Sequence, residues 1–258
     1  MKLLLIDGNN LIFRAYYATS YSGIMKTSFG AYTNAVYAFA NMLNKALKQI
    51  KPQYCAVAFD KGKHTFRHDL NPDYKGGRKA TPAELIEQFE TVRKMLKAYN
   101  IPYLEFEDIE ADDIIGTLSK KFSDTKTCIL SSDKDLLQLI DDTTSVYVMK
   151  KGLSDIVQMD ERALYEEYGL KPAQVIDFKG LAGDSSDNIK GVEGVGEKTA
   201  IKLLQSYETV EGIYEHIDEV KGKMKEKLIN GKDSAFLSKT LATIKTDVNI
   251  DMQLDDLR

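Results

Sequence analysis

The sequence predicts an α/β protein with a central parallel sheet, followed by a smaller helical region. Three apolar runs, at residues 2–7, 53–60 and 127–133, each end in an aspartate. Runs of this length and composition are typical of buried parallel strands. From about Asp160 onward the strand-like runs stop, and short helical stretches separated by glycine and proline turns follow. We therefore expect an α/β core over residues 1–160 and a helical region over residues 161–258.

The composition of the chain is typical of a globular protein. The chain has 258 residues, of which 43% are hydrophobic, so it can fold around a proper core. Cys55 and Cys128 lie inside predicted strands and indicate core residues rather than a disulfide. The first apolar run is cut off by Asp7, and no apolar run is long enough for a signal peptide or a membrane span. We expect a cytoplasmic protein without membrane contact.

The three aspartates that end the strands, Asp7, Asp60 and Asp133, are candidate site residues. A single aspartate at the end of a strand is usually a turn residue or a helix cap. In open α/β sheets, however, functional sites lie beyond the carboxyl ends of the strands. Three acids at the same carboxyl edge of the predicted sheet therefore predict one shared site.

Two long helices are predicted between these strands. Apolar residues recur at helical spacing over about residues 31–50. A second helix begins near residue 81, with Thr81 as the predicted N-cap, Pro82 as the first helical residue and Glu84 completing a capping box. Both helices indicate packing and carry no chemistry of their own.

A third helix opens with Glu110, Asp112 and Asp113. The helix dipole favours acids in a first turn, so one or two of them need no further cause. Three acids in four positions repel one another, and a bound cation would offset that repulsion. We therefore favour metal binding here.

The acids Asp133 and Asp135 follow the third predicted strand and add two more candidate metal ligands. Beyond them we expect a short helix over residues 136–140 and a short strand near residues 146–149. These two elements complete the predicted core.

The stretch from residue 61 to residue 79 is basic and aromatic. Its basic residues are Lys61, Lys63, Arg67, Lys75, Arg78 and Lys79, interleaved with His64, Phe66, His68 and Tyr74. Such a mixture suits a single nucleic-acid strand, because charge follows the backbone and rings stack on bases. The alternative is a solvated surface loop, but the position directly after Asp60 favours a functional segment.

Arg14 lies close behind the first strand. It is either a solvated helix residue or a phosphate ligand, and its place near the sheet edge favours a phosphate ligand.

The stretch from Gly183 to Ala200 combines two chemical features. Asp184 and Asp187, three residues apart, can face one divalent ion. Glycines at 191, 194 and 196 let backbone N–H groups approach a phosphate at the start of the next helix. The alternative is an aspartate helix cap followed by an ordinary loop.

A second basic cluster lies at residues 221–232. It is either a contact for duplex backbone or a solvated helix face.

These motifs, taken together and in order, resemble the 5′ nuclease (flap endonuclease) family. The closest resemblance is to the 5′→3′ exonuclease domain at the N-terminus of bacterial DNA polymerase I and to its free-standing relatives. The resemblance covers nearly the whole chain and rests on residues 7–10, 57–60, 66–68, 74–78, 110–113, 132–135 and 183–200. It implies a PIN-like, Rossmann-like sheet with a helical arch around residues 61–100 and a helix-hairpin-helix (H3TH) at residues 188–204.

The resemblance also implies roles for individual residues. The first-metal cluster would be Asp7, Asp60, Glu110, Asp112 and Asp113, with Asp133 between the metals and Asp135, Asp184 and Asp187 at the second metal. The catalytic set would be Lys75, Arg78, Asp60, Asp112 and Asp133. The DNA contacts would be Arg14, Arg67, Tyr74, Lys75, Arg78, Gly191, Val192, Gly194, Val195, Gly196, Lys198 and Thr199.

The implied activity is hydrolysis of phosphodiester bonds at 5′ ends and 5′ flaps of DNA, in replication and repair. The implied cofactors are two Mg²⁺ ions, for which Mn²⁺ can substitute, and a K⁺ ion at the hairpin. Two divalent ions about 4 Å apart can activate a water and stabilise the leaving oxygen. The implied partner is DNA at a junction of duplex and single strand, bound by a monomer, with a DNA polymerase domain in the same or another chain.

Two other functions compete with this one. A PIN-type RNA endonuclease shares the acid-ended parallel strands but normally lacks the hairpin at residues 191–200. A catalytically silent DNA-structure-binding module would not need the full acidic set.

Overall fold

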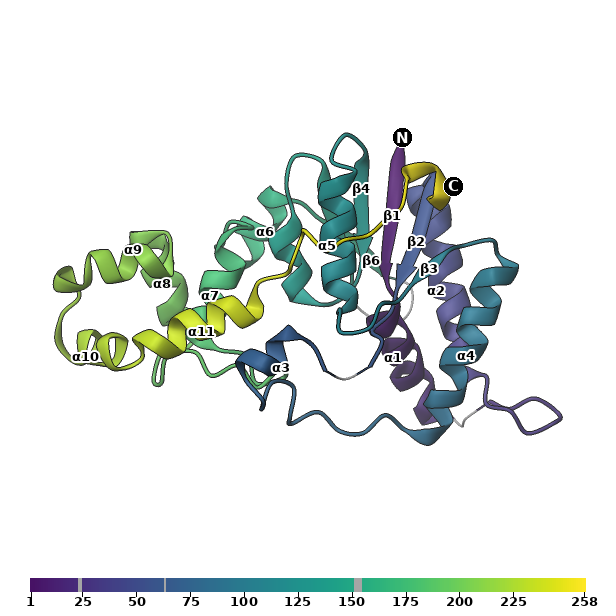
Figure 1. Ribbon diagram of the computed structural model, residues 1–258, viewed down its shortest axis with the longest axis horizontal. Coiled ribbons are helices and arrows are strands. Elements are labelled where there is room, and N and C mark those ends of the chain that lie inside the picture. Colours follow the sequence, from purple (N-terminus) through teal and green to yellow (C-terminus); the bar gives the residue numbers. More distant parts are fainter. Residues whose placement is uncertain (23–24, 63, 151–154) are drawn as a thin grey trace.

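The structure is a computed structural model that describes residues 1–22, 25–62, 64–150 and 155–258. Within these ranges, a six-stranded sheet has the strand order β3-β2-β1-β4-β5-β6 (Figure 1). The strands are β1 (Lys2–Asp7), β2 (Tyr54–Ala58), β3 (Tyr103–Leu104), β4 (Lys126–Leu130), β5 (Thr144–Met149) and β6 (Ile156–Met159). All neighbours pair in parallel except β5 and β6, which are antiparallel. The predicted α/β fold with a mainly parallel sheet is confirmed.

The three acid-ended runs form strands β1, β2 and β4, which lie next to one another in the sheet. Leu3, Leu4, Leu5 and Ile6 of β1 are buried, because helices cover both faces of the sheet. The sequence analysis did not predict β3 and β6. Two-residue β3 is too short to give a pattern, and two of the four residues of β6 are exposed.

Helices α1 (Gly8–Thr19), α2 (Asn34–Ile50), α4 (Ala83–Ala98) and α5 (Ala111–Lys121) cover the two faces of the sheet. This part of the chain also contains the short helix α3 (Phe66–Leu70) and the 3₁₀ helices η1 (Ser20–Ser22) and η2 (Lys134–Leu139). Helices α1, α2 and α4 share one core with the sheet, which includes Leu11, Phe39 and Val92. Helix α5 packs on the other face through Ile114 and Leu118.

After β6 the described chain is helical. Its elements are α6 (Glu161–Tyr168), α7 (Gln174–Ala182), α8 (Glu197–Tyr207), α9 (Val210–Glu215), η3 (Ile217–Glu219), α10 (Gly222–Asn230), α11 (Lys232–Ala242) and η4 (Leu254–Leu257). Helices α7 to α11 enclose a separate core that includes Leu181, Leu204 and Leu228. After α11 the chain crosses back over α5 to the sheet, where Ile244, Ile250 and Leu257 join the α5 core (Figure 1).

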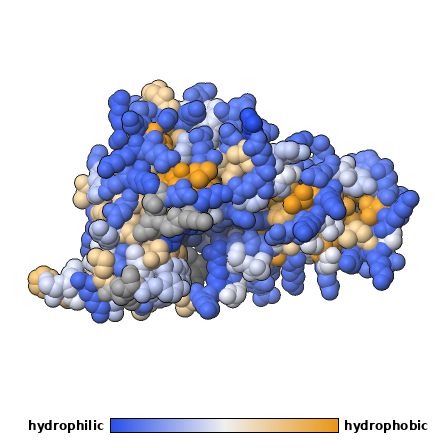
Figure 2. All heavy atoms as spheres, turned by 180° about the vertical axis from the view of Figure 1, so that it is seen from behind, coloured by the Kyte–Doolittle hydropathy of each residue, from blue (hydrophilic) through white to orange (hydrophobic). Residues whose placement is uncertain are grey.

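The surface agrees with this distribution of apolar residues. Seen from behind, the molecule is mainly hydrophilic, with hydrophobic residues in small separate patches (Figure 2). No helix of the described residues is long and apolar enough to cross a membrane.

The predicted start of the second long helix, near residue 81, is wrong in one respect. Helix α4 begins at Ala83, its N-cap is Pro82, and no side chain caps it. Glu84 accepts a hydrogen bond from the hydroxyl of Tyr16 at 2.6 Å, so a contact with α1 replaces the predicted capping box. The helix predicted over residues 136–140 is the 3₁₀ helix η2, and the helix predicted from residue 31 begins at Asn34.

Asp141 organises the turn before β5. Its Oδ1 accepts hydrogen bonds from the backbone N–H groups of Thr143 and Thr144 at 2.9 and 2.8 Å, and its Oδ2 lies 2.7 Å from Nζ of Lys120. Burial alone would raise the pKa of Asp141, but Lys120 and Thr143 lower it to about 2.

We expect Asp141→Ala to lower the free energy of unfolding by about 1–2 kcal/mol at pH 7, because it removes a turn-capping carboxylate. The pKa in the folded state lies below the unfolded value of about 3.9, so this contribution is complete above that pH and is lost as the pH falls through about 2. Urea denaturation of both proteins should show a smaller difference at pH 3 than at pH 7. A difference that stays constant would contradict this role.

Candidate metal and nucleic-acid site

Three neighbouring strands bring Asp7, Asp60 and Asp133 to one edge of the sheet. Asp7 ends β1, Asp60 follows β2 by two residues, and Asp133 follows β4 by three. Two of them are also helix caps, the alternative that the sequence left open. Oδ1 of Asp7 accepts the N–H of Asn10 at 2.9 Å, and Oδ1 of Asp133 accepts the N–H of Asp135 at 2.9 Å. Capping fixes one oxygen of each carboxylate and leaves the other for a second partner.

Asp112, from the first turn of α5, adds a fourth carboxylate to this edge. Burial, followed by repulsion from Asp133 and Asp60, raises the pKa of Asp7 to about 7. Burial, followed by repulsion from Asp133 and Asp7, raises the pKa of Asp112 well above its usual value. Burial also raises the pKa of Asp60, despite the nearby charge of Lys75. In the described chain, no basic side chain forms an ion pair with any of these four carboxylates, which we call the first carboxylate group.

Basic side chains neutralise the other candidate acids. Nζ of Lys75 pairs with Glu110, and Nη2 of Arg78 lies 2.5 Å from Oδ1 of Asp187. Lys179 of α7 pairs with both Asp135 and Asp184. We call Asp135, Asp184 and Asp187 the second carboxylate group.

The pKa values of Asp135 and Asp184 differ in direction. Burial and repulsion from Asp133 raise the pKa of Asp135 to about 7 and outweigh the attraction of Lys179. Burial acts in the same direction on Asp184, but Lys179 and Ser186 lower its pKa to about 2. Ser186 donates two hydrogen bonds to Oδ1 of Asp184, at 2.8 Å from its N–H and 2.6 Å from its hydroxyl.

The donor set fits a hard divalent cation. The candidate ligands are carboxylate oxygens, which Mg²⁺ prefers, and a cation would relieve the repulsion within the first carboxylate group. Oδ1 of Asp135 is buried, and the ammonium of Lys179 is its one partner among the described residues. As placed, no three acidic, histidine or cysteine side chains of the described residues converge closely enough to hold an ion. Metal binding would therefore require these carboxylates to move closer together.

In the structure, Arg67 and Asp113 are paired with each other. The guanidinium of Arg67 is 3% exposed and makes two parallel hydrogen bonds to Asp113, at 2.8 and 2.9 Å. It also donates to the carbonyls of Leu241 and Thr243 at 2.9 and 2.8 Å. Arg67 is thus enclosed in the protein.

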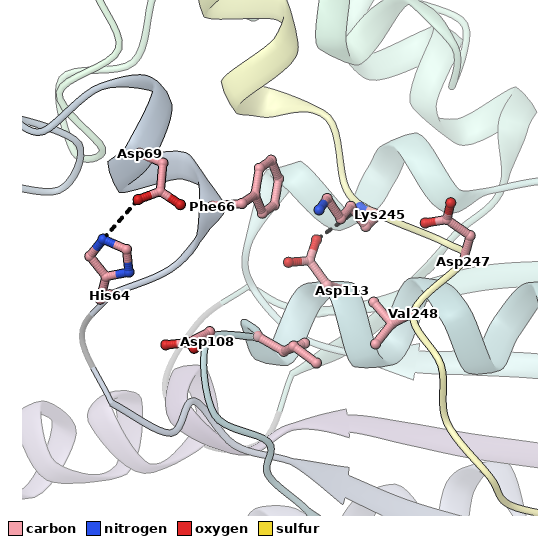
Figure 3. A pocket seen from close by; sticks show the side chains of 9 residues that line it. His64, Phe66, Asp69, Asp108, Asp113, Lys245, Asp247 and Val248 are labelled. Carbon is pink, nitrogen blue, oxygen red and sulfur yellow. Dashed lines mark hydrogen bonds and ion pairs between the residues drawn. The ribbon is translucent and has the colours of Figure 1, made fainter.

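Asp113 lies apart from the first carboxylate group. Besides Arg67, it accepts the N–H of Lys245 at 2.8 Å. Figure 3 shows its carboxylate directed at Lys245, in a pocket of about 500 Å³ that Phe66 and Asp247 also line. Successive helix residues point about 100° apart, so adjacent Asp112 and Asp113 face different surroundings.

The basic side chains of residues 61–79 are paired with acids to a greater extent than we expected. We expected their charges to be available for a single strand, but Lys61 pairs with Glu107, and Arg67, Lys75 and Arg78 pair with acids of the site. Tyr74 is 4% exposed and donates hydrogen bonds to Asp187 and Glu110 at 3.3 and 3.4 Å, so its ring is not available for stacking. Lys63 lies outside the described residues.

The glycine hairpin separates into a buried and an exposed part. A Cβ atom on Gly191 would lie 2.3 Å from the backbone nitrogen of Gly183, so only glycine fits this crossing. The N–H of Gly191 donates to Ser238, and its carbonyl accepts from Ser234, at 2.9 and 2.5 Å. Val192 and Val195 are buried in the helical core. Both backbone polar groups of Gly191 are therefore engaged in internal hydrogen bonds.

The exposed part of the hairpin is Gly194, Gly196 and Lys198, with Thr199 half-buried behind it. Gly196 caps α8, and Lys227 of α10 donates a hydrogen bond to the carbonyl of Gly194 at 3.2 Å. This contact joins the second basic cluster to the hairpin.

Several residues that hold the site together were not predicted. Side-chain oxygens of Asn9 and Asn10 accept the N–H groups of Asp60 and Ser132 at 3.0 and 2.9 Å, and so fix the ends of β2 and β4 against α1. Ser131 donates to Asp7 at 2.9 Å. Arg14 donates to Ser132 and to the carbonyl of Lys150, both at 3.3 Å. The signal for Asn9 and Asn10 was their place directly after Asp7.

Lys179 was also missed, because nothing in the sequence marks it beyond a position five residues before Asp184. Only the packing of α7 against η2 brings it to Asp135.

We expect Arg67→Ala to lower the free energy of unfolding by about 3–5 kcal/mol, because it leaves Asp113 and Glu110 buried without their guanidinium partner. The matched control is Arg162→Ala, whose ion pair with Glu166 is exposed and contributes about 0–1 kcal/mol. Urea denaturation measures both. If Arg67 were instead a DNA contact, its variant would weaken DNA binding while its stability matched the control.

Comparisons with known proteins agree over the whole chain. A family model described as 5′-3′ exonuclease, N-terminal resolvase-like domain, matches residues 2–169, and one described as 5′-3′ exonuclease, C-terminal SAM fold, matches residues 170–258. The chain is 51% identical over 259 residues to DNA polymerase I of Bacillus subtilis (strain 168), covering 99% of this chain and 29% of that protein. It is 51% identical over 261 residues to DNA polymerase I of Streptococcus pneumoniae (strain ATCC BAA-255 / R6), covering 99% and 30%. The chain thus spans less than a third of these curated relatives.

Two solved structures are similar in fold. One is T5 5′-exonuclease with bound zinc, with a TM-score of 0.77 and 25% identity, covering 94% of this chain and 89% of that one. The other is a bacteriophage T5 flap endonuclease in a pseudo-enzyme-product complex with DNA and metal ions, with a TM-score of 0.75, 25% identity and the same coverage, 94% and 89%.

Proposed function

Because the chain belongs to the 5′-3′ exonuclease family of nucleases, we propose that it hydrolyses phosphodiester bonds at 5′ ends and 5′ flaps of DNA, in replication and repair. The observation that carries this proposal is the first carboxylate group, Asp7, Asp60, Asp112 and Asp133. Four acids that repel one another at the carboxyl edge of a parallel sheet are a destabilising arrangement unless cations bind there.

We propose that two divalent ions, Mg²⁺ or Mn²⁺, bind at the two carboxylate groups, with Asp133 next to both. Asp133 repels Asp7 and Asp112 on one side and Asp135 on the other, which supports this intermediate position. Bound there, such ions would activate a water and neutralise the charge that develops on the leaving 3′ oxygen. Asp113 is left out of the ligand set, because Arg67 occupies both of its oxygens.

The protein's own cations act on the phosphate. Lys75 and Arg78 lie on the segment that follows α3. Lys75 pairs with Glu110 at the start of α5, and Arg78 pairs with Asp187 of the second carboxylate group. We propose that they bind the phosphoryl oxygens as negative charge develops there. The N–H of Lys75 donates to the carbonyl of Asp187 at 2.9 Å, which fixes the backbone of this residue beside the second carboxylate group.

The duplex would contact the helical region. Gly194, Gly196 and Lys198 are the exposed part of the hairpin, and the N-terminus of α8 favours an anion. We propose that this turn binds the DNA backbone without reading bases, with a K⁺ ion between the turn and a phosphate. Arg14, which donates to Ser132 beside Asp133, would hold the backbone near the cleaved bond.

The proposal extends to the organisation of the protein. Residues 1–160 would form the catalytic core, with an arch around residues 61–100, and residues 161–258 would form the DNA-binding region, with the helix-hairpin-helix at residues 188–204. We propose that the chain acts as a monomer in the cytoplasm. We also propose that it works with a DNA polymerase, since the curated relatives named above are DNA polymerase I.

We expect Asp112→Asn to abolish cleavage without harming the fold. Asp112 has no ion pair to a described residue, so the variant removes repulsion and leaves no cation unpaired. The Mg²⁺-dependent rate of cleavage of a 5′-flap duplex should fall by roughly a hundredfold or more. The matched control is its neighbour: Asp113→Asn should lower the melting temperature, because it breaks the buried pair with Arg67.

The measurements are single-turnover cleavage with product sizing and a thermal melt. Cleavage of single-stranded RNA in preference to the flap would favour a PIN-type RNA endonuclease. Flap binding without cleavage by the parent protein would indicate a silent DNA-binding module. Near-parental cleavage by Asp112→Asn would remove this residue from the site.

We expect Lys75→Ala to slow cleavage by roughly a hundredfold while weakening duplex binding much less, because its ammonium acts on the scissile phosphate. Lys61→Ala is the matched control, since Lys61 lies on the same segment but pairs with exposed Glu107. Single-turnover rates and binding in Ca²⁺ separate the two effects. Equal losses in rate and in affinity would show that Lys75 is only a general phosphate contact.

A further inference from the structure

Lys179 bridges two acids of the second carboxylate group. Its side chain extends from α7 and is only 11% exposed, which is unusual for a lysine. Nζ contacts Oδ1 of Asp135 and lies 2.5 Å from Oδ2 of Asp184. One acid comes from η2, at the end of β4, and the other directly follows α7, so the ammonium joins the core to the helical region.

The ammonium of Lys179 neutralises both acids. It lies against Oδ1 of Asp135, which is buried and has no other hydrogen-bond partner among the described residues. Asp184 is bound by Lys179 and also by Ser186, which donates two hydrogen bonds to its Oδ1. Asp135 therefore depends on Lys179 more than Asp184 does.

We propose that Lys179 is a built-in counter-cation of the second carboxylate group, and that a divalent ion binds there by displacing its ammonium. This inference rests on the proposed function, since it takes Asp135 and Asp184 as ligands of the second ion. Lys179 would thereby set how strongly that ion binds.

The physical reason is that one position cannot hold both cations. Mg²⁺ demands near-octahedral oxygen ligands at about 2.0–2.1 Å, and an ammonium between the same carboxylates blocks that geometry. A divalent ion and an ammonium this close also repel each other, because a protein surface screens charges less than bulk water does. The first carboxylate group has no such competitor in the described chain, so the two groups differ in what an ion must displace.

A second lysine provides a matched control. Nζ of Lys239 lies 2.6 Å from both Asp177 and Glu211, with its side chain 18% exposed. It makes the same kind of bridge between two acids, but these acids belong to the helical region and to neither carboxylate group.

Calorimetric titration with Mn²⁺, without DNA, tests the displacement. In Lys179→Met the weaker of two binding events should tighten by about tenfold or more, because the competing charge is gone. Lys179→Arg, which keeps the charge, and Lys239→Met should leave it unchanged. Unchanged or weaker binding in Lys179→Met would overturn the inference. A single binding event in the parent would instead overturn the two-ion function and, with it, the inference.

Thermal melting gives an independent readout. In chelator, both lysine-to-methionine variants should melt several degrees below the parent, since each leaves two acids without their cation. Added Mg²⁺ should restore Lys179→Met and not Lys239→Met. A failure to restore Lys179→Met would show that Lys179 is only a structural cation.

A measurement on the parent protein covers the case in which Lys179→Met does not fold. Acetylation of lysine amines, followed by mass spectrometry, reports the accessibility of each ammonium. Mg²⁺ should increase labelling of Lys179 and leave Lys239 unchanged. Constant or decreased labelling of Lys179 would contradict displacement.

Discussion

Crowding of negative charge at one edge of the sheet is the constraint on which the rest of the structure depends. Strands β2, β1 and β4 end side by side, and the first turn of α5 and the loop after α7 bring further acids to the same place. Burial strengthens the repulsion between these carboxylates, because fewer water molecules screen it. Every element around this edge supplies something that holds the acids in position.

The molecule meets this constraint in two ways. Lys75, Arg78 and Lys179 neutralise the acids nearest to the helical region, whereas Asp7, Asp60, Asp112 and Asp133 are held by backbone and hydroxyl donors or by packing alone. The formal net charge of the chain does not reveal this division between paired and unpaired acids. A formal charge of −4 therefore does not exclude a polyanionic substrate, because several of the acids are gathered at one edge of the sheet and basic residues lie next to them.

The buried pair of Arg67 and Asp113 connects the parts that must act together. Arg67 lies on α3, Asp113 on α5, and the carbonyls that Arg67 also binds belong to the end of α11 and the segment after it. The segment that carries Lys75 and Arg78 is thus anchored to the helix that carries Asp112 and to the helical region. A buried bidentate pair has one favourable geometry, so it fixes the relative position of these elements more firmly than apolar contact would.

The sequence alone determined the central strands and most of the acids, because apolar runs that end in aspartate specify both a buried parallel strand and a place at its carboxyl edge. It could not separate Asp112 from Asp113, since adjacent acids in a helix differ only in what surrounds them. It likewise assigned Arg67 and Tyr74 to DNA, because their enclosure depends on α11 and Asp187, which are more than a hundred residues away. Lys179 had no pattern of its own. Which charges are paired and which stay open for a cation was decided only by tertiary packing, because an ion pair depends on distance in space and not on spacing along the chain.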